Sequence, residues 1–209
     1  MFNDILKTIQ KELKIKEDVQ EELMRDMRKA TRLSKQAIFL VHQERFEEAE
    51  TLLEQASMLF SKLREVSSDY PDLIYRGFVY SAFEENAEAH AFINLVRDNR
   101  YIDPNELGIP HHSYILGVAD VIGEFRRRAL DMIRKGNEKE AERCLQTMEY
   151  IYGELINMDD ALILINGLRL KCDVARNLIE ITRGDVTNDV RRSSLENRLK
   201  KLEKFLEKA

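Results

Sequence analysis

Hydrophobic residues recur every three or four positions along most of the chain, which is the period of an α-helix. The clearest stripe runs from Val19 through Leu23, Met27 and Ala30 to Leu40. The pattern predicts an all-α protein of about seven helices. The length is enough for one large domain or two small ones, and we expect a single domain over residues 1–209. The predicted helices cover residues 16–43, 46–66, 72–96, 112–134, 138–156, 159–182 and 188–208.

Helix-breaking residues mark the ends of these predicted helices. Pro71 directly precedes the third helix, with Asp69 as a candidate cap, and residues 97–110 form the longest internal loop. Gly136 ends the fourth helix, and Gly184 is predicted to separate the last two. The similar segments EEAE and KEAE fit either repeated helical hairpins of the tetratricopeptide kind or two ordinary hairpins.

Composition and charge narrow the class of protein. The 209 residues carry a net charge of −5, which argues against a nucleic-acid binder that relies on overall positive charge but not against a local basic stripe. We expect no transmembrane helix, because no apolar run approaches about 18 residues, and the N-terminus lacks the features of a signal peptide. Cys144 and Cys172 form no metal motif and are too few for a disulfide scaffold, so we expect a cytoplasmic protein.

Two carboxylates interrupt the most apolar predicted helix. Glu85 and Glu88 are three residues apart and share one face of a segment that is otherwise rich in Phe, Tyr, Val, Ala and Ile. A buried carboxylate needs a partner, and a divalent cation is one that several acids can share. The alternative is that both acids are exposed on an otherwise buried helix.

A second acid pair lies on the next long helix, where Asp120 and Glu124 are four residues apart. For this pair the alternative is an ordinary solvated face. Oxygen ligands favour Mg²⁺, with Mn²⁺ as a second choice, over zinc. A di-iron site is disfavoured because no histidine has a glutamate three residues before it.

Mg²⁺ held by carboxylates and open to water is suited to phosphodiester hydrolysis. Three arginines follow the second acid pair, and the helical period places Arg127 on the side of Asp120 and Glu124. Arg127 and its neighbour Arg128 are therefore candidates to hold a phosphate beside the metal, whereas Arg126 points nearer the core. The alternative role for these arginines is charge balance.

Two motifs resemble a known family. The segment Tyr114–Asp120 (YILGVAD), followed by Gly123 and Glu124, is similar to a signature of the translin superfamily. The segment Glu85–Ala89 (ENAEA), followed by Phe92, is similar to the Glu-x-x-Glu-Ala motif of its translin-associated factor X branch. The resemblance covers most of the chain, and its specific motifs lie between residues 75 and 136.

The resemblance implies a translin-like helical bundle that assembles into a closed, barrel-like octamer. It also implies a Mg²⁺-dependent endoribonuclease that cuts single-stranded RNA inside the barrel, in a compact prokaryotic form that works as a homo-oligomer. The branch's catalytic and metal-binding acids carry over onto Glu85, Glu88, Asp120 and Glu124. Arg76 and Arg127 match basic positions that are associated with RNA contact.

Two other functions compete with the nuclease. A non-catalytic barrel that binds single-stranded RNA or DNA, as translin does, is disfavoured by the intact set of four acids. A helical interaction scaffold is favoured only by the charged last helix, and it predicts neither metal binding nor cleavage.

Overall fold

The computed structural model describes residues 1–206, apart from the side chains at positions 74, 75, 197 and 205. Within this part the chain forms eight α-helices and one 3₁₀ helix, and no described helix is long and apolar enough to cross a membrane. The helices form two compact units, Met1–Gly117 and Val118–Ala209. The predicted all-α class is confirmed, whereas the single domain over the whole chain stays a prediction.

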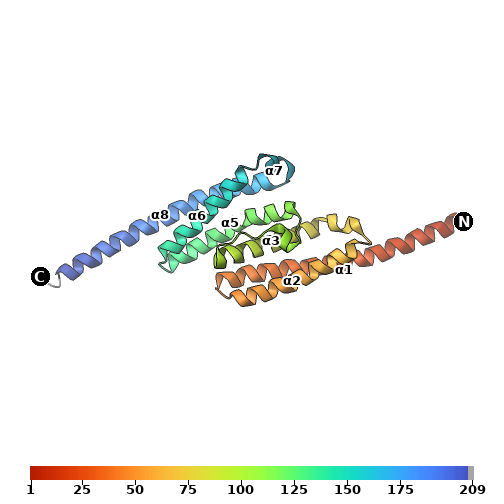
Figure 1. Cartoon of the computed structure of the whole chain (residues 1–209), viewed down its shortest axis with the longest axis horizontal. Helices are drawn as coiled ribbons and strands as arrows, with labels where there is room; N and C mark the ends of the chain where they lie inside the picture. Colours follow the sequence, from red (N-terminus) through yellow and green to blue (C-terminus); the bar gives the residue numbers. More distant parts are fainter. Residues whose placement is uncertain (207–209) are drawn as a thin grey trace. The chain divides into compact units, whose positions relative to one another are not determined.

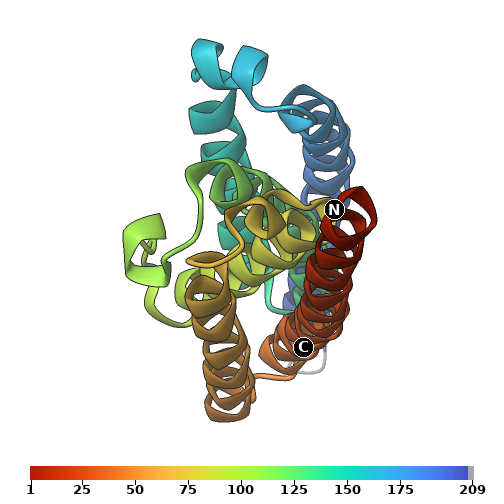
Figure 2. The same cartoon turned by 90° about the vertical axis from the view of Figure 1, so that its right-hand side faces the viewer.

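The first unit is built on a helical hairpin. Helices α1 (Phe2–His42) and α2 (Phe46–Ser67) are joined by a short turn and lie side by side (Figures 1 and 2). Both pack against α3 (Gly77–Asp98), so the apolar stripe of α1 is buried from Leu23 to Val41. Helix α1 begins 14 residues earlier than predicted, because residues 2–15 keep the helical period although their side chains are exposed.

The start of α3 differs from the prediction. Residues Pro71–Tyr75 form the 3₁₀ helix η1, and Arg76 is extended before α3 begins at Gly77. Proline at the first position suits either kind of helix, so the sequence did not separate them. The oxygen Oδ2 of Asp72 lies 2.9 Å from Nζ of Lys16, and this hydrogen bond lowers the pKa of Asp72.

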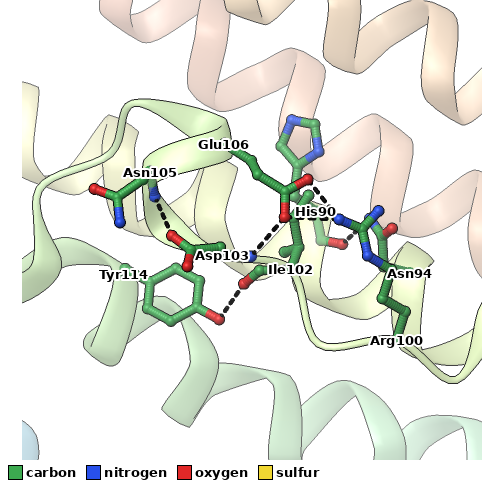
Figure 3. Close-up of polar contacts among 8 residues, drawn as sticks. All are labelled: His90, Asn94, Arg100, Ile102, Asp103, Asn105, Glu106 and Tyr114. Atoms are coloured by element: carbon green, nitrogen blue, oxygen red, sulfur yellow. Dashed lines mark hydrogen bonds and ion pairs between the residues drawn. The ribbon is translucent and has the colours of Figure 1, made fainter.

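The loop between α3 and α5 (His111–Arg134) is held by polar contacts and contains the short helix α4 (Pro104–Leu107) (Figures 2 and 3). Asp103 caps α4, since its Oδ1 accepts from the backbone N–H of Asn105 at 2.7 Å. Arg100 pairs with Glu106 at 2.6 Å, and the hydroxyl of Tyr114 donates to the carbonyl of Ile102 at 2.6 Å. These bonds fix the loop that leads into α5.

The second unit contains most of α5, α6 (Glu138–Ile156), α7 (Asp159–Leu164) and α8 (Leu168–Leu206). Asn137 caps α6, because its Oδ1 accepts from the backbone N–H of Glu140 at 3.2 Å. The predicted break at Gly184 is wrong. One buried stripe continues across it at helical spacing, and its residues are Cys172, Ala175, Ile179, Thr182, Val186 and Asp189.

The buried imidazole of His90 makes the first unit sensitive to acid. Its Nε2 has no hydrogen-bond partner among the described residues, and burial lowers the pKa of His90 to about 4. Between about pH 6.5 and pH 4 the unfolded chain therefore binds a proton that the folded chain does not. The free energy of unfolding should fall as the pH drops through this window.

We expect His90→Gln to remove this part of the pH dependence, because glutamine does not titrate. Urea unfolding at about pH 7 and about pH 4.5 measures the difference for wild type and variant. His111→Asn is the matched control, since His111 is exposed. An equal loss of stability on acidification in wild type and His90→Gln would contradict the assignment.

Candidate metal centre

The first acid pair lies on a helix that is buried along most of its length. Glu88 is only 8% exposed and Glu85 is half-buried, so neither is the exposed surface acid that the sequence left open. Oε2 of Glu85 lies 3.4 Å from Nζ of Lys35 on α1. Between the two acids Asn86 is buried, and its Nδ2 donates to Oγ of Ser34 at 3.3 Å. The buried hydrogen bond of Asn86 links this face of α3 to α1.

A glycine allows α5 to approach the same stretch of α3. A Cβ on Gly117 would lie 2.4 Å from the carbonyl oxygen of Glu84, 2.8 Å from Cβ of Ala87 and 2.9 Å from the amide nitrogen of Glu88. These distances are far below van der Waals contact, and two of the three atoms belong to the backbone. The two helices therefore meet backbone to backbone beside Glu88.

The second acid pair lies on α5 within the second unit. The side chains of Asp120 and Glu124 are 39% and 24% exposed, so they are partly buried rather than fully solvated. Asp120 forms an ion pair with Lys171 of α8. Glu124 lies 4.0 Å from Arg127, one turn further along α5.

The predicted RNA-binding arginines differ in their surroundings. Arg76 and Arg127 are exposed, and Arg76 lies 3.9 Å from Asp72. Arg128 is buried, with its Nε 3.2 Å from Oε1 of Glu140, so its charge already has a partner inside its own unit. Arg126 points to α8, as expected for the least favoured of the three, and donates to Oγ1 of Thr182 at 2.7 Å.

The sequence analysis missed the two lysines that accompany the acids. Lys35 is 50 residues from Glu85, and Lys171 is 51 residues from Asp120, so no local pattern connects either pair. The one available signal is that Lys171 stands next to the buried stripe of α8, between Leu168 and Ala175. A lysine at that position keeps its stem on apolar surface and carries its ammonium group to the edge.

Each unit contributes two of the four acids. Among the described residues, no group of three or more His, Cys, Asp or Glu side chains is close enough together to hold a metal ion. All four donors are carboxylates at helical spacing, a set that suits Mg²⁺ or Mn²⁺ better than zinc. A site that joins the two pairs stays a prediction.

Comparison with known proteins decides the family. The sequence pattern of the Translin family matches residues 18–206. The chain belongs to the Translin family. This confirms the resemblance that the motifs carry, and with it the translin-like all-α fold.

Relatives of this Translin-family chain support the assignment. An uncharacterised protein of Methanocaldococcus jannaschii is 32% identical over 190 residues, which are 90% of this chain and 84% of that protein. A structure of AfC3PO in complex with duplex RNA superposes with a TM-score of 0.80 at 34% identity, over 90% of this chain and 97% of that chain. A crystal structure of AfC3PO gives a TM-score of 0.80 at 35% identity, with the same coverage.

Gly117→Ala should destabilise this Translin-family protein, because its new methyl group meets the backbone of α3. The expected loss is about 1–3 kcal/mol of unfolding free energy, measured by urea denaturation. Gly123→Ala is the control on the same helix. A Cβ there meets no atom within 4 Å, so the change should stabilise by about 0.5–1 kcal/mol through helix propensity. Equal effects of the two changes would show that the close approach at Gly117 is absent.

Proposed function

We propose that this Translin-family protein is a Mg²⁺-dependent endoribonuclease that cuts single-stranded RNA, with Mn²⁺ as an alternative metal. Glu85, Glu88, Asp120 and Glu124 would hold the metal. The runner-up is a translin-like barrel that binds single-stranded RNA or DNA without cutting it. The four carboxylates favour the nuclease, because a pure binding surface for phosphates gains nothing from acids.

The observation that carries the proposal is the buried carboxylate of Glu88 beside the close approach of Gly117. Glu88 is 8% exposed, and it lies on α3 where Gly117 of α5 meets that helix. Asp120 follows Gly117 by three residues on α5, which is one turn of the helix. The resemblance to the factor X branch is what joins the two acid pairs into one proposed site.

The acids would act as deprotonated oxygen ligands. A bound Mg²⁺ would activate a water molecule and neutralise developing charge on the phosphate. Arg127 is exposed and lies near Glu124, so its guanidinium group could hold a phosphate oxygen through two hydrogen bonds. Arg76 is a further candidate contact to RNA, whereas the buried Arg128 serves its own unit.

Single-stranded and duplex RNA need to be compared directly as substrates. The relative AfC3PO is described in complex with duplex RNA, whereas the resemblance to the factor X branch implies a single-stranded substrate. Both forms of one labelled RNA should therefore be tested. We expect faster cleavage of the single strand, as the resemblance to the factor X branch implies.

Mg²⁺ should support cleavage of the labelled single strand, and EDTA should abolish it. Asp120→Asn and Glu88→Gln should each reduce the rate of cleavage by about a hundredfold. Each change replaces a charged ligand by a neutral amide of nearly the same shape. Asp131→Asn is the control, because Asp131 is an acid of the same helix whose partner is Arg134 at 3.1 Å. It should cut at the wild-type rate.

Three results would each contradict a part of the proposal. Full activity of both acid variants would remove the metal site, and binding of RNA without any cleavage would favour the non-catalytic barrel. Absence of both cleavage and binding would leave the interaction scaffold.

We further infer that the protein forms a homo-oligomer, an octamer by resemblance. The end of α8 supports this inference, because a row of half-exposed leucines runs along one face at the four- and three-residue spacing of a coiled coil. The row consists of Leu195, Leu199, Leu202 and Leu206.

Leu199→Glu should therefore lower the mass measured by light scattering, because it places a charge in the apolar row. Ser194→Glu introduces the same charge at an exposed position outside the row and should leave the mass unchanged. A monomeric wild type, or an unchanged mass for Leu199→Glu, would argue against this contact.

A further inference from the structure

A groove of about 320 Å³ lies between α5 and α8 in the second unit, beside the Asp120–Lys171 ion pair. Its walls are apolar apart from these two side chains. Leu170 and Val174 stand at its rim and are 69% and 50% exposed. The apolar lining consists of Ala119, Ile122, Leu170, Val174, Ala175 and Leu178.

Gly123 opens this groove on the side of α5. A Cβ at this position would meet no atom within 4 Å, in contrast to Gly117 on the same helix. The missing side chain therefore leaves room beside Asp120 instead of allowing two helices to touch. A flat apolar group could lie over Gly123 between the aliphatic side chains of α8.

The charge next to the groove indicates what kind of molecule could bind in it. Lys171 places an ammonium group at the groove, and its partner is one of the four proposed metal ligands. If Asp120 binds a divalent cation, both positive groups favour a phosphate at this edge. A nucleotide combines the two features, because its phosphate is joined through ribose to a base whose flat faces can pack on apolar side chains.

We propose that the groove holds one base of the RNA strand and that Lys171 contacts the phosphate of the same nucleotide. The proposal rests on the proposed nuclease function and specifies how the substrate is held there. Only Asp120 and Lys171 could form side-chain hydrogen bonds in the groove. The subsite therefore accepts a base by shape and apolar contact, without strong preference for its identity.

Gly123→Leu tests the proposal by filling the groove. Its affinity for a labelled single-stranded oligonucleotide in EDTA should fall about tenfold, as expected for the loss of one base contact. With Mg²⁺, KM should rise by a similar factor while kcat stays near the wild-type value. Gly153→Leu is the matched control on α6, because a Cβ there also meets no atom within 4 Å.

An oligonucleotide series with one abasic nucleotide at successive positions identifies the occupant. Loss of the base at one position should weaken binding to wild type but not to Gly123→Leu, whose groove is already filled. Lys171→Gln should weaken binding of both the intact and the abasic strand. Thermal unfolding of each variant checks that it is folded.

The outcomes separate this proposal from the nuclease assignment. Wild-type binding without cleavage would refute the nuclease, and the affinity of Gly123→Leu would still decide the subsite. Unchanged affinity and KM for Gly123→Leu would overturn the subsite alone. A changed mass of Gly123→Leu in light scattering would also overturn it, because the groove would then be a contact between copies of the chain. Absence of RNA binding by wild type would overturn both proposals.

Discussion

Helix α5 can approach α3 this closely only because Gly117 has no side chain. A methyl group there would overlap the carbonyl of Glu84 and the amide of Glu88, and backbone in a packed helix has little freedom to move aside. The position of Glu88 at this crossing is thus set by backbone contact rather than by a flexible side chain. Rigid support of this kind is what a site for a metal requires of its ligands.

Positive side chains accompany the acids within each unit. Lys35 pairs with Glu85, and Lys171 pairs with Asp120. Ion pairs that are partly open to water contribute little to stability, so these contacts do not hold the helices together. Their consequence is electrostatic: the lysines compensate acids that would otherwise repel one another on a helix face. A divalent cation that bound these carboxylates would have to compete with an ammonium group.

The hydrophobic period was sufficient for most helices, because each buries one stripe against its own unit. The prediction of the last helices failed at Gly184, where a local helix-breaking residue and tertiary packing favour different structures. Gly184 lowers helix propensity by about 1 kcal/mol, but the buried stripe from Cys172 to Asp189 continues past it and keeps α8 intact. Glu85 and Glu88 could be predicted as site residues because carboxylates are out of place in an apolar helix. Lys35 and Lys171 were missed because only the fold brings them to those acids.

The negative charge of the chain bears on how it could bind RNA. A net charge of −5 gives no long-range attraction, so binding must come from short-range contacts at a few places. Contacts between lysine or arginine and phosphate weaken as salt rises, whereas contact between a base and aliphatic side chains does not depend on counterion release. Under the proposed subsite, the groove beside Gly123 would add such an apolar contribution next to Lys171. Pairing the two kinds of contact at one nucleotide would let a chain with few basic positions retain a single strand.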